Sequence, residues 1–187
     1  MAFTESTMLP LGTKAPYFEL PDTISGKTLT INALQSKKAT VIVFSCNHCP
    51  YVLHLNKGIV ALAKDYQPQG VSFIVISSND ADKYPEDAPH LMTILAKKEG
   101  YTFPYLYDKT QEVARAYDAA CTPDFYVFDG EMRLAYRGRF DGARPKNDLP
   151  VTGADLRAAL DAVMANEPVA EKQYPSGGCN IKWKITV

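Results

Sequence analysis

The feature that most constrains this chain is a pair of cysteines, Cys46 and Cys49, at a predicted junction between a strand and a helix. Residues 39–45 form a nearly continuous apolar and β-branched run, which is typical of a strand buried on both faces of a parallel sheet. From Pro50 to Tyr66 apolar residues recur at helical spacing, and a proline suits the first helical turn because no amide donor is needed there. A Cys-x-x-Cys motif at such a corner indicates a redox dithiol.

The position of this motif gives the two thiols a physical reason to react. A helix amino terminus presents unpaired amides and a partial positive charge, and both favour thiolate over thiol. The two-residue spacer lets the second sulfur reach the first, so that closure of a small ring releases a partner from a mixed disulfide. We interpret Cys46 and Cys49 as catalytic residues. The alternative is a pair of buried structural cysteines.

The rest of the chain predicts an α/β fold with a central mixed sheet flanked by helices. A buried strand, a short strand and the two strands of a hairpin are expected at 71–76, 105–107, 125–128 and 134–138. Further helices are expected over 91–100, over 108–117 with Asp108 as N-cap and Gln111 as capping partner, and from Thr152 onward. The resulting order is strand, helix, strand, helix, hairpin and helix.

We divide the chain into an N-terminal arm at 1–14, a domain at 15–165 and a C-terminal tail at 166–187. A length of 187 residues suits one well-cored domain and is short for two. At the start of the domain, residues 17–20 and 27–30 flank a glycine turn and predict a small N-terminal hairpin.

Composition excludes several classes of function. The net charge of −1 provides no basic field, so we expect no nucleic-acid partner. No apolar run approaches the roughly 18 residues that a membrane helix needs, so we expect no membrane partner. The amino terminus does not read as a signal peptide, which favours the cytoplasm, and in that compartment four cysteines are not a disulfide scaffold.

Three segments, 11–16, 44–50 and 121–129, resemble the redoxin branch of the thioredoxin superfamily, which contains peroxiredoxins and thiol–disulfide oxidoreductases. The resemblance spans about residues 10–165 and implies a thioredoxin-like fold. It also implies that Cys46, as the more exposed sulfur, attacks and that Cys49 resolves. It further implies that Thr122 and Pro123 are joined by a cis peptide bond beside the dithiol and shape the substrate groove; the sequence alone allows an ordinary trans proline.

The motif departs from the pattern of the peroxiredoxins. Peroxiredoxins carry a motif similar to Pro-x-x-x-Thr-x-x-Cys. When this chain is aligned with it on Cys49-Pro50, Cys46 stands at the threonine position and Ile42 at the proline position. A peroxidatic role would therefore fall on Cys49. Such enzymes also use a guanidinium, for which Arg137 and Arg139 are the candidates; the alternative is that both are solvent-facing charges on a hairpin.

Several neighbours of the motif have more than one interpretation. An imidazolium at His48 would stabilise a nearby thiolate, or the residue is only a spacer. Cys121 would pair with an active-site sulfur, help bind a soft metal, or pack as a small hydrophobe. Cys179 would act as a second resolving thiol, or it is incidental to a tail that packs through Ile181 and Trp183.

The loop from Ser77 to Pro89 is expected at the sheet edge where ligands of α/β proteins bind. It is either a docking surface for substrates or a solvated connection. Neither His54 nor His90 is assigned a function.

The leading hypothesis is a cytoplasmic thiol–disulfide oxidoreductase without cofactor or metal. Its partners would be protein or small-molecule disulfides, and a cellular thiol system would reduce it. One alternative is a peroxiredoxin-like hydroperoxide reductase with an antioxidant role. A second is a copper or zinc protein using the two thiols with His48, His54 or Cys121, although no histidine follows His90 to complete such a site.

Overall fold

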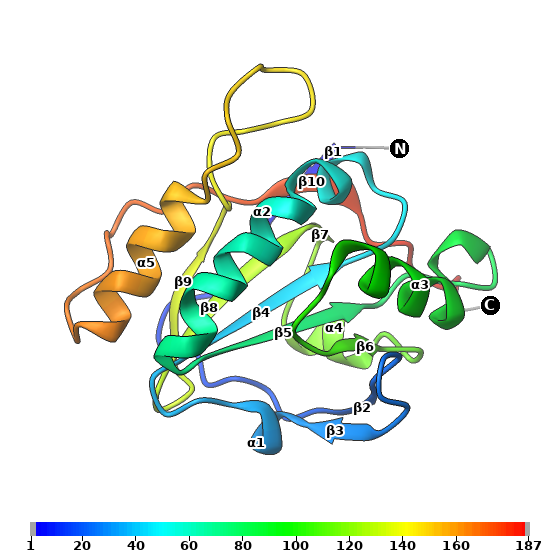
Figure 1. Cartoon of the computed structure of the whole chain (residues 1–187), viewed down its shortest axis with the longest axis horizontal. Coiled ribbons are helices and arrows are strands. Elements are labelled where there is room, and N and C mark those ends of the chain that lie inside the picture. Colours follow the sequence, from blue (N-terminus) through cyan, green and yellow to red (C-terminus); the bar gives the residue numbers. More distant parts are fainter. Residues whose placement is uncertain (1–2, 186–187) are drawn as a thin grey trace.

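The structure, a computed structural model, describes residues 3–185, so the first two residues of the expected arm and the last two of the expected tail lie outside it. A five-stranded mixed sheet in the order β6-β5-β4-β8-β9 forms its centre (Figure 1). The central strand β4 (Ala39–Ser45) pairs in parallel with β5 (Val71–Ser77) and antiparallel with β8 (Asp124–Asp129). The edge strands are β6 (Tyr105–Tyr107) and β9 (Leu134–Gly138). The predicted fold class is confirmed.

Alternation along β4 explains why both faces of the sheet are covered. Val41 and Val43 face one apolar cluster, whereas Ile42 and Phe44 face the other. The first cluster lies under the helices α2 (Pro50–Tyr66), α3 (Pro89–Glu99) and α5 (Ala154–Met164). The second is covered by the helices α1 (Ile31–Leu34) and α4 (Glu112–Ala116) and by the hairpin of β2 (Glu19–Pro21) and β3 (Thr28–Thr30). Short 3₁₀ turns occupy Gln67–Gln69 and Pro85–Asp87.

A second, three-stranded sheet joins the two ends of the chain. Its order is β1-β10-β7, formed by β1 (Phe3–Glu5), β10 (Gly177–Asn180) and β7 (Cys121–Thr122), all antiparallel. In this register Cys179 lies opposite Thr122 on one side and Phe3 on the other. Residues of the expected arm and the expected tail therefore meet beside the Thr122-Pro123 segment.

Helix α2 has the predicted bounds, and α3 ends before Gly100, which adopts a left-handed conformation with φ of 72°. The helix predicted over 108–117 is shorter, and the prediction that Asp108 is its N-cap was wrong. The N-cap is Gln111, with φ of 66°, and the Asp108 carboxylate instead accepts a hydrogen bond of 2.9 Å from the Ala114 amide inside the helix. No helix among residues 3–185 is long and apolar enough to span a membrane.

Gly178 tests how closely β10 packs against the Thr122-Pro123 segment. A methyl group at this position would overlap the carbonyl oxygen of Thr122, and a backbone atom cannot rotate away. We expect Gly178→Ala to lower the free energy of unfolding by about 1–3 kcal/mol, measured by urea denaturation. The matched control is Gly142→Ala, whose new methyl would meet only Leu149 at 3.5 Å. Equal effects of the two substitutions would contradict the close packing of β10.

Candidate active site

The two cysteines of the motif lie at the carboxyl end of β4, where the chain turns into α2. Cys46 directly follows the strand, and Cys49 is the N-cap of the helix, with Pro50 as the first helical residue. Both are buried, with 1% of Cys46 and none of Cys49 exposed, so neither is notably more accessible than the other. Together with Val52 and Cys179 they form a small apolar cluster. No disulfide joins any of the cysteines in the described part of the chain.

Thr122 lies against both sulfurs of the motif. Its hydroxyl is 3.4 Å from Sγ of Cys46, and its carbonyl oxygen is 3.1 Å from Sγ of Cys49. The peptide bond between Thr122 and Pro123 is cis. The Thr-Pro segment therefore forms one wall of the site, as the family resemblance implies.

The loop between β5 and α3 forms another wall, through Asp87. This carboxylate is fully buried and accepts hydrogen bonds of 2.7 Å from the amide of Asn47 and from the side-chain amide of Asn79. The Asn47 side chain is also fixed, since it donates to the Glu86 carbonyl and accepts from the Tyr105 hydroxyl. This loop had two interpretations, a docking surface or a solvated connection, and part of it instead packs inward against the motif. The sequence pattern did not single out Asp87.

The side chain of His48 is fixed on the same wall. Its Nδ1 lies 2.8 Å from Oδ2 of Asp87, an ion-pair distance, although the two groups are not aligned for a hydrogen bond. Its ring stacks on that of Tyr84 at 5.9 Å between centroids and 3° between planes. His48 is thus held by two neighbours in the loop and is not an unconstrained spacer.

The neighbours of the two sulfurs shift the pKa values of Cys46 and Cys49 in opposite directions. The pKa of Cys49 is lowered to about 5, chiefly because the Cys46 thiol donates a hydrogen bond to it. Burial opposes this shift, while the thiol and amide of Cys179 and the amide of Val52 add to it. The pKa of Cys46 is raised because its proton bonds to Cys49, because it is buried, and because Asp87 is nearby. The Thr122 carbonyl accepts a hydrogen bond from Cys49 only when Cys49 is protonated, so it opposes this shift. The groups that donate to the Cys49 sulfur are more numerous than this one acceptor. The hydrogen bonds therefore favour a thiolate on Cys49 over one on Cys46.

Cys121 is buried in β7 with its sulfur 3.7 Å from the Pro123 carbonyl, and burial raises its pKa. Its surroundings are those of a small buried hydrophobe.

The two candidate arginines of a peroxide site have other partners. Arg137 is fully buried, which excludes the solvent-facing interpretation; it lies 3.2 Å from the Asp124 carboxylate and over the ring of Tyr126. Arg139 is partly exposed and pairs with Asp155 at 2.5 Å. Within the described residues, neither donates a hydrogen bond to a cysteine.

One group of side chains has the geometry to hold a metal ion. Ligand atoms of Cys46, His48 and Asp87 all lie within 4.8 Å of one another. Of the ligands considered from sequence, His48 belongs to this group, whereas His54 and Cys121 do not. A thiolate, an imidazole and a carboxylate together would suit zinc.

The fold and the buried Cys-x-x-Cys beside a cis-proline segment define a thioredoxin-fold redox protein. Residues 11–137 match the AhpC/TSA family, and the chain belongs to this redoxin family. No curated protein matches the chain.

Several solved structures are similar to the chain. An uncharacterized conserved protein from Geobacillus kaustophilus is 56% identical, with a TM-score of 0.98 over 100% of this chain and 99% of that one. A hypothetical protein from Sinorhizobium meliloti 1021 is 46% identical, with a TM-score of 0.95 over 98% and 100%. A thiol:disulfide interchange protein from Chlorobium tepidum TLS, at 19% identity and a TM-score of 0.64 over 82% and 97%, shares the fold.

The charge distribution predicts which cysteine titrates first in the reduced protein. We expect one thiolate to appear with a midpoint near pH 5, because Cys49 collects the hydrogen-bond donors of the site. Ultraviolet absorbance of the thiolate against pH measures this midpoint. Cys49→Ser should abolish the transition, and Cys46→Ala should move it upward by removing the main donor. Cys121→Ala is the control and should leave it unchanged; a transition that survives in Cys49→Ser would contradict the assignment.

Proposed function

We propose that this protein is a thiol–disulfide oxidoreductase whose working couple is the dithiol and disulfide of Cys46 and Cys49. The observation that carries the proposal is the position of these two buried sulfurs together at the amino terminus of α2, with Thr122 against both. Such a pair is poised to lose two electrons and close a disulfide. The reaction needs no bound cofactor, since both electrons come from the protein's own sulfurs.

The reaction starts from the thiolate. Family resemblance assigns the attack to Cys46, but the hydrogen bonds favour Cys49 as the nucleophile, and we adopt that assignment. Cys49 attacks a substrate disulfide, forms a mixed disulfide and releases the first substrate thiolate. The Cys46 sulfur then attacks Cys49, its proton passes to the second substrate sulfur, and that thiol leaves. The substrate disulfide is reduced to two thiols, and the protein is oxidised to the Cys46–Cys49 disulfide.

Substrates of this chemistry are protein or small-molecule disulfides, with a cellular thiol system restoring the dithiol. A hydroperoxide reductase is the second candidate, favoured by the low pKa of Cys49 at the position aligned with a peroxidatic cysteine. Against it, Nη2 of Arg137 pairs with Asp124 and Nε of Arg139 pairs with Asp155, and within the described residues neither guanidinium donates a hydrogen bond to a cysteine.

Titration through glutathione redox buffers tests the proposal. Thiols are trapped by alkylation at each potential, and disulfides are mapped by mass spectrometry. We expect a reversible disulfide between Cys46 and Cys49, absent from Cys46→Ser and from Cys49→Ser, with Cys121→Ser as the unaffected control. Two sulfurs that stay reduced throughout would overturn the dithiol mechanism. Rapid hydrogen peroxide consumption that is lost in Cys49→Ser and retained in Cys46→Ser would favour the peroxidase instead.

Asp87 should tune the potential of this couple. Its buried negative charge lies beside the motif and repels the negative charge that the reduced dithiol carries, so its removal stabilises the reduced form relative to the disulfide. We expect Asp87→Asn to raise the reduction potential by roughly 10–30 mV, measured in the same redox buffers. The amide keeps an oxygen that can accept from Asn47. Glu86→Gln, which neutralises the exposed neighbour, is the control. A lower potential in Asp87→Asn would contradict this role.

A further inference from the structure

A cavity of about 320 Å³ lies beside the dithiol, on the side of β10. Its walls include Phe3, Tyr51, Arg144, Pro145, Lys146 and Cys179. Cys179 is the cysteine that this cavity reaches; Cys46 and Cys49 do not line it. The volume falls at the small end of the range for small-molecule sites, which is about 300–1,000 Å³. A small molecule in this cavity meets Cys179 before it meets the dithiol.

Cys179 also contacts Cys49 of the dithiol. Its thiol and its amide both donate hydrogen bonds to the sulfur of Cys49. Strand pairing fixes this contact, because Cys179 stands opposite Thr122, whose carbonyl lies against the same Cys49 sulfur. One side chain thus bridges the cavity and the sulfur that holds the thiolate.

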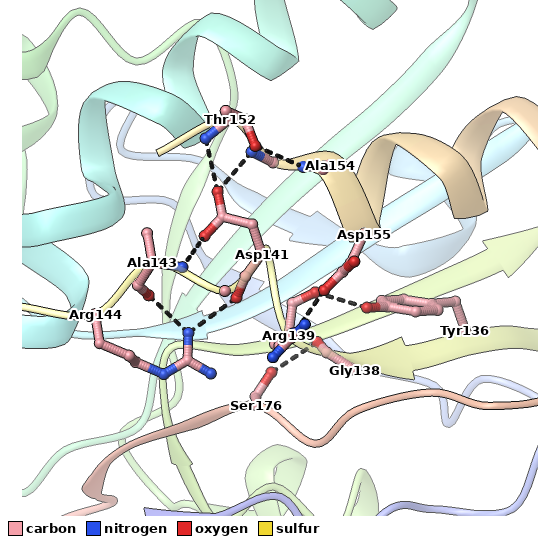
Figure 2. A network of polar contacts seen from close by, with 12 residues as sticks. Tyr136, Gly138, Arg139, Asp141, Ala143, Arg144, Thr152, Ala154, Asp155 and Ser176 are labelled. Atoms are coloured by element: carbon pink, nitrogen blue, oxygen red, sulfur yellow. Dashed lines mark hydrogen bonds and ion pairs between the residues drawn. The ribbon is translucent and has the colours of Figure 1, made fainter. Parts of the chain in front are cut away.

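Two positively charged residues, Arg144 and Lys146, line the cavity from a loop that hydrogen bonds hold in place. Figure 2 shows the Asp141 carboxylate accepting hydrogen bonds from the amides of Ala143 and Thr152. It also accepts one from the amide of Gly153, and the three bonds are 2.7–2.8 Å long. One nitrogen of the Arg144 guanidinium donates to the carbonyls of Asp141 and Ala143; its other N–H groups make no hydrogen bond to residues 3–185. In Figure 1 this loop, between β9 and α5, projects on the side of β1 and β10. Lys146, two residues on, is exposed.

We propose that Cys179 is an exchange thiol that accepts the disulfide from Cys46–Cys49 and presents it to a small acidic thiol bound in this cavity. The proposal rests on the proposed function and extends it by naming the class of electron donor and its path. Carboxylate groups of the donor face Arg144 and Lys146, while its sulfur faces Cys179.

The exchange balances without any further oxidant. The Cys179 thiol attacks Cys49 in the Cys46–Cys49 disulfide; a Cys49–Cys179 disulfide forms, and Cys46 leaves with the proton. An incoming thiolate then attacks Cys179 and expels Cys49 as thiolate. A second molecule of thiol attacks the resulting mixed disulfide, which frees Cys179 as a thiol and releases the donor as its own disulfide. Two donor thiols are oxidised, and the protein regains its dithiol.

The direction of attack follows from the geometry, because Cys179 lines the cavity and Cys49 does not. A sulfur of low pKa leaves faster, and the pKa of Cys49 is lowered. Attack at Cys179 therefore comes from the side that the cavity reaches and expels the better leaving group.

The first test uses Cys46→Ser, a near-isosteric change that leaves Cys49 and Cys179 as partners. Treatment with oxidised glutathione should produce an intramolecular Cys49–Cys179 disulfide, mapped by mass spectrometry. Cys46→Ser/Cys179→Ser should instead stop at a glutathione adduct on Cys49, and Cys46→Ser/Cys121→Ser is the matched control that should still close the ring. Near-ultraviolet circular dichroism confirms that each variant is folded. A stable adduct on Cys49 in folded Cys46→Ser would overturn the proposal.

The second test compares donors of different charge on the oxidised wild-type chain. Lys146→Gln should slow reduction by mercaptoacetate roughly two- to fivefold and leave the rate with 2-mercaptoethanol unchanged. Lys98→Gln, an equal charge change at an exposed site on α3, is the control and should alter neither rate. In Cys179→Ser the effect of Lys146→Gln should disappear. Equal slowing by both lysine substitutions would overturn the role of the cavity.

These outcomes separate the two proposals. A wild-type Cys46–Cys49 disulfide, with no Cys49–Cys179 disulfide in Cys46→Ser, refutes the exchange role of Cys179 and leaves the oxidoreductase intact. Absence of the Cys46–Cys49 disulfide at every potential refutes the proposed function itself and, with it, the path through Cys179.

Discussion

The contact of Thr122 with two sulfurs is the constraint on which the site depends. Its hydroxyl meets Cys46 and its carbonyl meets Cys49, although it is more than seventy positions from either in the chain. The antiparallel register of β4 and β8 brings it there, since Phe44 pairs with Asp124 immediately after the Thr-Pro segment. The same residue pairs with Cys179 through β7 and β10. One short segment thus sets the positions of three cysteines, so a shift of the sheet register would dismantle the whole site.

Burial strengthens the effect of these contacts on the two thiols. Hydrogen bonds and charges act more strongly in a poorly solvated environment than in water. The proton donated by Cys46, together with the donors of Cys179 and Val52, therefore lowers the pKa of Cys49, while the pKa of Cys46 is raised. Asp87 reinforces the asymmetry from the far side, and its own burial is tolerated because amides of Asn47 and Asn79 satisfy it. The polarity of the dithiol arises from this arrangement, and the Cys-x-x-Cys spacing alone would not specify it.

The elements that the sequence predicted well are those with a regular pattern. The apolar run of β4 and the helical spacing of α2 mark the two elements that carry the motif, and the structure has both where they were expected. Asp87 was not singled out, because its acidic loop has no periodicity and its burial depends on partners far along the chain. The strand in the tail was not predicted either, because Gly177–Asn180 lacks a strand-like pattern. It forms β10 because β1 and β7 lie on either side. Irregular segments take their structure from tertiary pairing, which a local pattern does not encode.

The distribution of positive charge distinguishes this site from a peroxide site with an arginine at the sulfur. Arg137 pairs with Asp124 in the protein interior, and Arg139 pairs with Asp155. Arg144 and Lys146 line the cavity that Cys179 also lines. Charge at that distance does not polarise a bond breaking at Cys49, but it attracts an acidic molecule toward the sulfur that touches Cys49. The electrostatics therefore agree with the proposed recognition of an acidic thiol rather than with activation of a peroxide.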